Sequence, residues 1–551
     1  MKRVTALILA TLMLVMIFSG CQKSDSSSST TSTGSSESSA STTSSESSAS
    51  ATSDESSDSN PYAEKITFTV YSLDDSDDFM NWPLVKEAKE KFNFDFTIQQ
   101  VAWDNWDETT RTLAATDSLP EVLAWYNLQY SEYKSWSLQG VLKALPDDMS
   151  SYPNLQKLMD EHDIFNKLKI DGKLYAFPKI NNNNPYNNYT PYLFINRNDW
   201  ASEMGKNFSP VEKMSWEEFV SYLKEIKEKD PAGLGDKLVP LDPENGGLDW
   251  YTLVSMWNPY LNSYKKDSSG KYVWGADDPS SLVGIQKIKE LYDAGLLAKD
   301  SYADKMESGQ ERFLAGRSAI LSGPYGPSLL QDTVYAGLKS NDSSVTEEDL
   351  NLLAITIDGK YPVQEITDWW AAFAFSNKCS DEQMNRFLAV GNWLLDEEQI
   401  EKYAYGIPGE DWTKSDSGEI MLNYNSEDTI PGASKAYIKD QALFQKFFIL
   451  EGLDIWLPGN PNVSDYLVND CYKTFLKTQE EAPDFTPHDY DYDFFSGTYK
   501  DQYGTLTDQI QAAVIQAVVS DDPEQTWNQF LNDNRATAQL VIDELNSALA
   551  K

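Results

Sequence analysis

Aromatic side chains stand next to amide or carboxylate side chains in four short stretches of this sequence. Flat rings pack against the apolar C–H faces of a carbohydrate, while amides and carboxylates hydrogen-bond the hydroxyls at its edges. This combination therefore favours a site for a sugar-like ligand. The candidate residues are Trp125 and Asn127 in LAWYNLQY, Asp249, Trp250 and Tyr251 in GGLDWYTLVSMW, Tyr325 in LSGPYGPS, and Asp368, Trp369 and Trp370 in EITDWWAAFAFS.

Aromatic residues of a large α/β protein more often pack against other protein groups than contact a ligand. A position on a polar loop after a strand strengthens the case for Trp125, Trp250 and Tyr325. Neighbours on a strand point to opposite faces, so we expect only one of Trp369 and Trp370 to face a ligand. The weaker candidates are Trp82, Trp103 and Trp456.

Few residues suit catalysis or metal binding. The two histidines, His162 and His488, have no cysteine or second histidine at ligand spacing, which argues against zinc and against a histidine-dependent triad. DYDYDFF imitates the start of a calcium loop, but Phe494 replaces the required glycine and Lys500 the final glutamate. The chain also lacks a GxxxxGKS or GxxxxGKT phosphate loop. We therefore expect no catalytic residue, no metal and no cofactor.

The formal net charge of −41 at pH 7 limits the classes of partner. Nucleic acid is bound by basic surfaces that displace counterions, and direct adhesion to anionic lipid also needs basic side chains. The charge therefore argues against a nucleic-acid partner, and it favours neutral or cationic ligands over polyanions.

The first 60 residues have the composition of an export signal and a tether. Lys2 and Arg3 precede an apolar run too short for a comfortable membrane span, and small residues stand just before Cys21. The ending FSGC resembles the bacterial lipobox, in which the cysteine is acylated after cleavage. We expect residues 1–20 to be a lipoprotein signal peptide and residues 21–60, which are serine-rich without apolar periodicity, to be a disordered tether.

Lipidation of Cys21 would hold the protein on the extracellular face of the bacterial cell membrane, with that lipid as its one membrane contact. The alternative is an ordinary secreted protein with an incidental cysteine. The other two cysteines, Cys379 and Cys471, fit two free thiols better than a disulfide, although spacing alone does not decide this.

Strand and helix patterns alternate directly after the tether. Residues 66–71 alternate apolar and polar side chains, a helical pattern follows from Pro83, and FDFTIQQVAW returns to strand character. A second helix leads to a short apolar strand at 122–125. This order predicts an open α/β sheet, in which ligands sit outside the carboxyl ends of the strands, where Trp125 and Asn127 would be.

Several motifs occur in an order that is similar to one protein family. TDSLPEVLAWYN, GVLKALPDDMSSYPNL, IDGKLYAFP, PYLFINRNDW, MSWEEFVSYLKEIKEKDP, RFLAGRSAILSGPYG and YAYGIPGEDW together resemble the extracellular solute-binding proteins (family 1-like, lipoprotein type) that feed carbohydrate ABC transporters. Each motif is weak alone, but together they span most of the chain after the tether.

The resemblance implies a periplasmic-binding-protein-like type II fold, with two discontinuous α/β lobes, a hinge and a ligand cleft between the lobes. By analogy, residues 61–193 and 367–403 would form lobe 1, and residues 194–366 and 404–551 lobe 2. A bound ligand that contacts both lobes would favour closure. The chain would cross between the lobes near residues 192–195, 366–370 and 403–406.

The resemblance also implies roles for the candidate residues. In maltose-type binders the position matching Trp125 carries a sugar-stacking tryptophan, and the segments with Trp250 and Tyr325 match places where second-lobe aromatics approach the ligand. The implied partners are a carbohydrate, expected to be an oligosaccharide, and the permease subunits of an ABC transporter. We expect a monomer that binds its ligand without converting it.

Two other functions stay open at this stage. The same fold could bind peptides or another small organic solute. An exported carbohydrate-active hydrolase is less favoured but stays open. A catalytic carboxylate pair is defined by its separation in space, so one sequence neither reveals such a pair nor excludes it.

Overall fold

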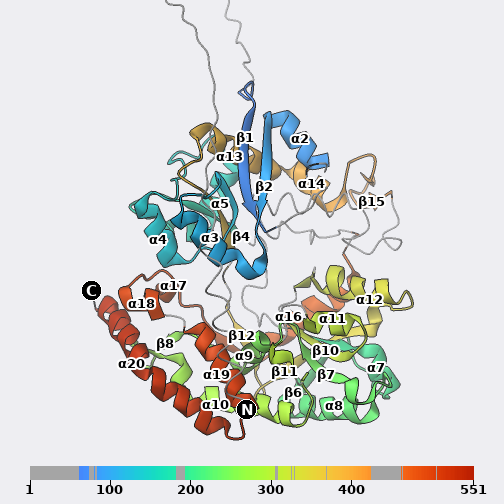
Figure 1. Ribbon diagram of the computed structural model, residues 1–551. Helices are drawn as coiled ribbons and strands as arrows, with labels where there is room; N and C mark the ends of the chain where they lie inside the picture. The colour runs from blue at the N-terminus through green and yellow to red at the C-terminus, as the bar shows by residue number, and fades with distance from the viewer. Residues whose placement is uncertain are drawn as a thin grey trace, which may run out of the picture. The chain divides into compact units, whose positions relative to one another are not determined.

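The computed structural model divides the chain into a unit of residues 1–59 and a unit of residues 60–551 (Figure 1). The fold is that of the second unit, and the predicted signal peptide, Cys21 and the tether lie outside the described residues. The structure describes residues 61–73, 80, 83–180, 193–298, 300–303, 308–323, 326, 327, 329–365, 367, 369–423, 461, 463–503 and 506–550.

The first sheet has five strands in the order β2-β1-β3-β13-β4. β1 pairs in parallel with β2 and β3, and β13 runs antiparallel to β3 and β4. The predicted strand-helix-strand unit is present, with α2 between β1 and β2. The strands are β1 (Ile66–Ser72), β2 (Phe94–Gln100), β3 (Val122–Tyr126), β4 (Ala176–Ile180) and β13 (Trp369–Phe375).

Helices accompany this sheet along the chain, and β13 returns to it from far along the sequence. The helices are α2 (Pro83–Phe92), the 3-10 turn η2 (Trp103–Asn105), α3 (Trp106–Ala115), α4 (Tyr130–Gln139), α5 (Pro153–Glu161), α6 (Ile164–Lys167), α13 (Asp381–Leu394) and α14 (Glu397–Tyr405).

The second sheet also has five strands, in the order β6-β11-β5-β10-β7. β5 runs antiparallel to β10 and β11, while β10 with β7 and β11 with β6 pair in parallel. The strands are β5 (Leu193–Arg197), β6 (Val211–Ser215), β7 (Val239–Pro243), β10 (Ser318–Gly323) and β11 (Leu350–Thr356).

The remaining elements belong mostly to this second part of the chain, including the long C-terminal helix α20, drawn in red in Figure 1. Helices are α7 (Asn198–Glu203), α8 (Trp216–Lys229), α9 (Gly247–Ser255), α10 (Pro279–Asp293), α11 (Ser308–Leu314), η6 (Leu329–Tyr335), α12 (Ala336–Asn341), η8 (Asp465–Lys473), α16 (Thr474–Gln479), α17 (Tyr490–Asp493), α18 (Thr498–Tyr503), α19 (Thr507–Val519) and α20 (Pro523–Leu549). Short strands are β8 (Tyr264–Lys266), β9 (Tyr272–Trp274), β12 (Tyr361–Gln364), β14 (Trp412–Lys414), β15 (Ile420–Leu422) and β16 (Pro483–Thr486).

Helix α8 shows how the local sequence specifies an element. Ser215 and Glu218 form a capping box, in which each side chain accepts a hydrogen bond from the other residue's backbone N–H. Such a cap stabilises a helix by about 1 kcal/mol. Phe219, Leu223 and Ile226 follow at helical spacing and are buried, as their periodicity predicts.

Buried apolar side chains form separate cores beneath the two sheets. One core contains residues of β1 to β4, β13 and α13, and two others contain residues of β5 to β11 together with the C-terminal helices. Cys379 lies in the first core and Cys471 in another, and both are free and buried. The chain therefore has a two-lobe α/β architecture.

The expected crossing at 403–406 falls at the end of helix α14. Residues 403–405 form its last turn, and the β14–β15 hairpin packs on that end, because Trp412 lies 5.2 Å from the Tyr405 ring and donates to the Gly406 carbonyl. Lys402 of α14 in turn pairs with Glu87 of α2 at 3.0 Å. The predicted range 404–551 thus begins with residues that pack on α14; the exact lobe boundaries stay a prediction.

Candidate functional site

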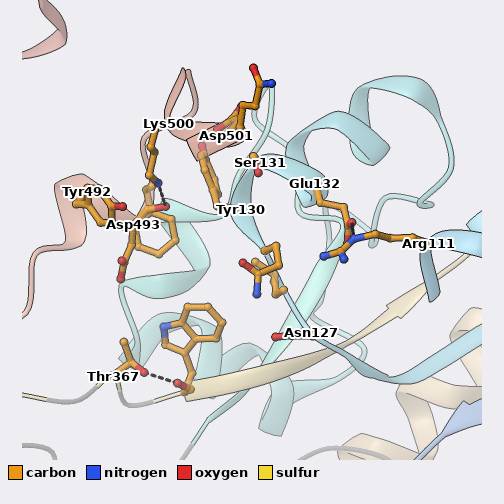
Figure 2. A pocket seen from close by; sticks show the side chains of 15 residues that line it. Arg111, Asn127, Tyr130, Ser131, Glu132, Thr367, Tyr492, Asp493, Lys500 and Asp501 are labelled. Atoms are coloured by element: carbon orange, nitrogen blue, oxygen red, sulfur yellow. Dashed lines mark hydrogen bonds and ion pairs between the residues drawn. The ribbon is translucent and has the colours of Figure 1, made fainter. Parts of the chain in front are cut away.

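A cavity of about 660 Å³ collects side chains from three distant parts of the sequence (Figure 2). They come from the loop after β3 with the first turn of α4, from the start of β13, and from α17 and α18. The site therefore combines residues of the part of the chain that forms the first sheet with residues of the C-terminal helices. The lining residues are Arg111, 127–132, Thr367, Trp369, 492–494 and 500–502.

The loop after β3 reaches the cavity because the strand ends there. All five residues of β3 are buried, and the chain turns at Asn127, whose carbonyl accepts from Gln129 N at 2.8 Å. The Asn127 side chain donates from Nδ2 to Asp107 Oδ1 at 2.9 Å. This hydrogen bond fixes the amide, so that its carbonyl oxygen is oriented before any ligand arrives.

Trp369 lies at the start of β13, where it pairs with Ile180 of β4. Its backbone carbonyl accepts from Thr367 Oγ1 at 2.5 Å, the contact drawn in Figure 2. Its indole Nε1 is buried and has no hydrogen-bond partner among the described residues. Because a buried donor without a partner costs free energy, a ligand hydroxyl placed against this indole would be stabilised.

An ion pair marks the α4 side of the cavity. Arg111 Nε donates to Glu132 Oε2 at 2.7 Å (Figure 2). Arg111 Nη2 also lies 3.9 Å from Asp107 Oδ2. Burial raises the pKa of Glu132 above its ordinary value, and Arg111 works in the opposite direction. Both residues line the cavity, so that Glu132 contributes carboxylate oxygens to it, and the positive charge of Arg111 offsets the negative charge of Glu132.

The opposite side is built by α17 and α18. Lys500 Nζ donates to the carbonyl oxygens of Phe495 at 2.8 Å and Asp493 at 3.4 Å, and lies 4.5 Å from the centre of the Tyr492 ring. Burial lowers the pKa of this lysine. The Asp493 carboxylate hydrogen-bonds His488 Nε2.

A second cavity of about 600 Å³ adjoins the first and shares Tyr130 and Phe494 with it. The two rings meet edge to face, with centroids 5.4 Å apart. The second cavity has a more aromatic and apolar lining than the first, with Tyr272, Tyr490, Phe495 and leucines of α20. Rings thus border both cavities at their junction.

Trp125, the strongest candidate from the sequence, lies in the core in this structure and is not part of the cavity lining. Its side chain is 3% exposed, because it lies within β3, a strand at the centre of the sheet, and not on the loop that follows it. Lys179 Nζ lies 3.5 Å from the centre of its ring, and Trp106 packs against its other parts with centroids 6.5 Å apart. Trp103, a weaker candidate, is the exposed member of this cluster, at 54%.

The predicted residues of the second lobe lie in helix α9. Trp250 is 0% exposed and donates from Nε1 to Ser301 Oγ at 3.0 Å. Asp249 is buried and accepts from Asn245 N at 2.7 Å, while burial raises the pKa of Tyr251. None of the three lines either cavity. The glycine pair begins a helix instead of a loop, and this helix packs against α10 and α19.

Three other candidates cannot be placed at the site. Tyr325 and Asp368 lie outside the described residues, and of Trp370 the structure describes the backbone in β13 but not the side chain. Of the nine candidates, the cavity therefore brings together Asn127 and Trp369.

The α17 segment was missed as a ligand site, although its sequence was noticed. DYDYDFF drew attention for its likeness to a calcium loop, but its carboxylates have other partners: Asp489 caps α17 by accepting from Tyr492 N, and Asp491 pairs with Lys266 at 2.9 Å. Among the described residues no group of three or more His, Cys, Asp or Glu side chains is placed to hold a metal ion. The available signal was the alternation of aromatic and acidic residues.

The chain matches the family model of the bacterial extracellular solute-binding protein over residues 83–408, more than half of its length. It belongs to this family, whose members bind solutes and are not enzymes. Of the described residues, no helix is long and apolar enough to cross a membrane.

A curated relative is the fructooligosaccharide ABC transporter substrate-binding protein FusA of Streptococcus pneumoniae serotype 4, which is 22% identical over 327 residues. The match covers 52% of this chain and 59% of that protein, so it spans less than two thirds of the relative's length.

Solved structures share the fold over most of their length. The alginate-binding protein AlgQ2, solved without calcium ion, is 16% identical with a TM-score of 0.63, and 88% of this chain matches 98% of it. FusA in complex with kestose is 15% identical with a TM-score of 0.61, over 88% and 100% of the two chains. An HMO-binding solute-binding protein from Bifidobacterium longum infantis is 15% identical with a TM-score of 0.61, and 88% of this chain matches 98% of it. At these identities the likeness establishes the two-lobe fold.

Proposed function

We propose that this protein is the extracellular substrate-binding lipoprotein of an ABC importer, that it captures an oligosaccharide between its lobes, and that it delivers this ligand to a membrane permease. The carrying observation is the cavity in which aromatic and hydrogen-bonding side chains from both lobes converge. Relatives named for a fructooligosaccharide ABC transporter and for alginate binding support the ligand class and the partner.

The cavity residues have chemically distinct roles in this proposal. The rings of Trp369, Tyr130 and Phe494 offer faces for sugar C–H groups, and the Trp369 indole N–H offers one donor. Oxygens of Asn127, Glu132 and Asp501 accept from ligand hydroxyls. Because these residues come from both lobes, a bound ligand would favour the arrangement in which the lobes are close.

Residues that the structure does not place at the cavity keep their proposed status. Tyr325, Asp368 and Trp370 belong to the proposed site because of the family resemblance, as does Cys21 to the lipid anchor on the outer face of the cell membrane. Trp125 has an indirect role in this proposal: it is buried in β3, the strand that places Asn127 at the cavity.

Titration of tryptophan fluorescence tests the proposal. Fructo-, gluco- and manno-oligosaccharides are added to the protein, and at least one series is expected to give a saturable change, because Trp369 borders the cavity. A peptide mixture serves as the comparison. Saturation by peptides alone would replace the carbohydrate with a peptide ligand, and release of shorter sugars from a labelled glycan would indicate a hydrolase.

A further inference from the structure

The first of the two cationic side chains that line the larger cavity is already committed to carboxylates. Arg111 is held by Glu132 at 2.7 Å and lies 3.9 Å from Asp107, and Asp107 also accepts from Asn127. A guanidinium in this position cannot turn its fork toward a ligand carboxylate without leaving a protein carboxylate unpaired in a partly buried place.

The second cationic side chain, Lys500, is directed toward its own backbone. Its ammonium donates to two carbonyl oxygens and lies over the Tyr492 ring. Asp493 and Asp501 stand close enough to act on its charge. Among the described lining residues, Arg111 and Lys500 are the only lysine or arginine side chains.

The remaining charged groups of the lining are carboxylates. Glu132, Asp493 and Asp501 border the cavity, and Asp501 is oriented by hydrogen bonds from Ser496 Oγ at 2.9 Å and Gly497 N at 3.2 Å. Ionised carboxylates accept hydrogen bonds and donate none. They therefore match the hydroxyl groups of a sugar and repel a carboxylate group on it.

We infer that the cavity selects uncharged oligosaccharides and rejects chains of uronic acids. This inference rests on the proposed function and narrows its ligand class. A ligand carboxylate that enters would lose hydration without gaining an available cation, and the chain's net charge of −41 adds a long-range repulsion. The fold alone does not determine whether a charged or an uncharged sugar is bound, because an alginate-binding protein and a protein in complex with kestose both share it.

A matched ligand panel tests the inference on the full-length protein. Kestose, maltotriose and mannotriose are compared with tri-uronates from alginate and polygalacturonate by fluorescence titration, at roughly 20 and 200 mM salt. Uronates are expected to bind at least about tenfold more weakly than the best neutral sugar. Affinity for the neutral sugar should not change with salt.

The outcomes separate the inference from the function on which it rests. Tight binding of a uronate, weakened by salt, would overturn the inference and leave the carbohydrate function standing. If no member of either group bound, the carbohydrate function itself would fail. Saturation by neutral sugars alone would support both.

The variant Glu132→Gln links selectivity to the ion pair. Removing this charge leaves Arg111 less compensated, so the ratio of neutral to uronate affinity should fall at least threefold, which a loss of folded protein would not produce. Glu228→Gln, an exposed residue of α8, is the matched control. An unchanged ratio in Glu132→Gln would show that the Arg111–Glu132 pair does not set the charge preference.

Discussion

The end of β3 and the first turns of α9 look alike in sequence but have different places in the structure. Trp125, Tyr126 and Asn127 stand at the end of the strand, and Asp249, Trp250 and Tyr251 stand near the start of the helix. After β3 the polar residue, Asn127, borders the cavity and the tryptophan is core. In α9 Asp249 and Trp250 are buried and Tyr251 is partly buried against the core, and none of the three lines the cavity. The position of a residue within its element, more than the polarity of its neighbours, decides whether it can meet a ligand.

The largest expected effect comes from the α9 side of this comparison. Trp250→Ala removes a fully buried indole and its hydrogen bond to Ser301, and should destabilise the protein by about 3–5 kcal/mol, as measured by urea unfolding. Ligand affinity of the folded fraction should be unchanged. A stable variant that has lost ligand binding would instead place Trp250 in the site.

The corresponding tryptophan of the cavity should affect binding more than folding. Trp369→Ala should weaken the neutral-sugar affinity by about 1–3 kcal/mol, because a ring face and a buried donor are lost. Isothermal titration gives the affinity. Trp103→Ala, which removes an exposed indole that lines neither cavity, is the control. Equal losses in both variants would contradict the assignment.

A smaller loss is expected at the rim. Asn127→Ala removes the amide that Asp107 orients, and ligand affinity should fall by about 0.5–1.5 kcal/mol in the same titration. The midpoint of thermal unfolding should stay close to that of the parent, since Asn127 is half-buried. Unchanged affinity would remove this residue from the site.

The smallest expected effect is a pH dependence of stability that comes from His488, which precedes α17 and pairs with Asp493 of that helix. Burial lowers the pKa of His488, but its hydrogen bond to Asp493 and the charges of Asp493, Glu365 and Asp489 raise it more, so that the pKa lies above its ordinary value. A raised folded-state pKa adds stability that is complete below about pH 6.5 and is lost as pH rises through the folded-state pKa.

His488→Gln should remove this pH dependence. The stability difference between parent and variant, followed by thermal unfolding from acidic to mildly alkaline pH, should shrink as pH rises and amount to less than about 1 kcal/mol for this half-exposed pair. A difference that grows with pH would show that the pairing with Asp493 has the opposite sign.

The sequence predicts the fold better than the site, for a physical reason. The capping box at Ser215 and the apolar spacing of α8 act between residues a few positions apart, and local patterns report such interactions directly. The order of motifs also predicts the family. The path of the chain near residues 403–406 was harder to predict from the sequence, because the end of helix α14 there packs against Trp412 of the β14–β15 hairpin.

The cavity depends on contacts between distant residues. Arg111 and Lys500 line the same cavity although almost 400 positions separate them. Asn127 borders the cavity just after β3 ends, and Trp369 borders it where β13 begins. A strand pattern indicates a position such as that of Asn127, whereas Trp369 was predicted from its neighbouring polar residues and from the family resemblance. Tyr130, Phe494 and Lys500 became candidates only when the fold had brought α4 and α17 together.

The two buried cysteines have a practical consequence for following lobe motion in solution. Burial raises the pKa of Cys379 and of Cys471 to about 12, so neither sulfur is a thiolate nucleophile at neutral pH. Maleimide dyes would react first with a cysteine introduced at an exposed position such as Tyr499. In the part of the chain that the structure describes, labelling of native cysteines should therefore be slow, so that dyes on introduced cysteines can report by fluorescence whether a sugar draws the lobes together.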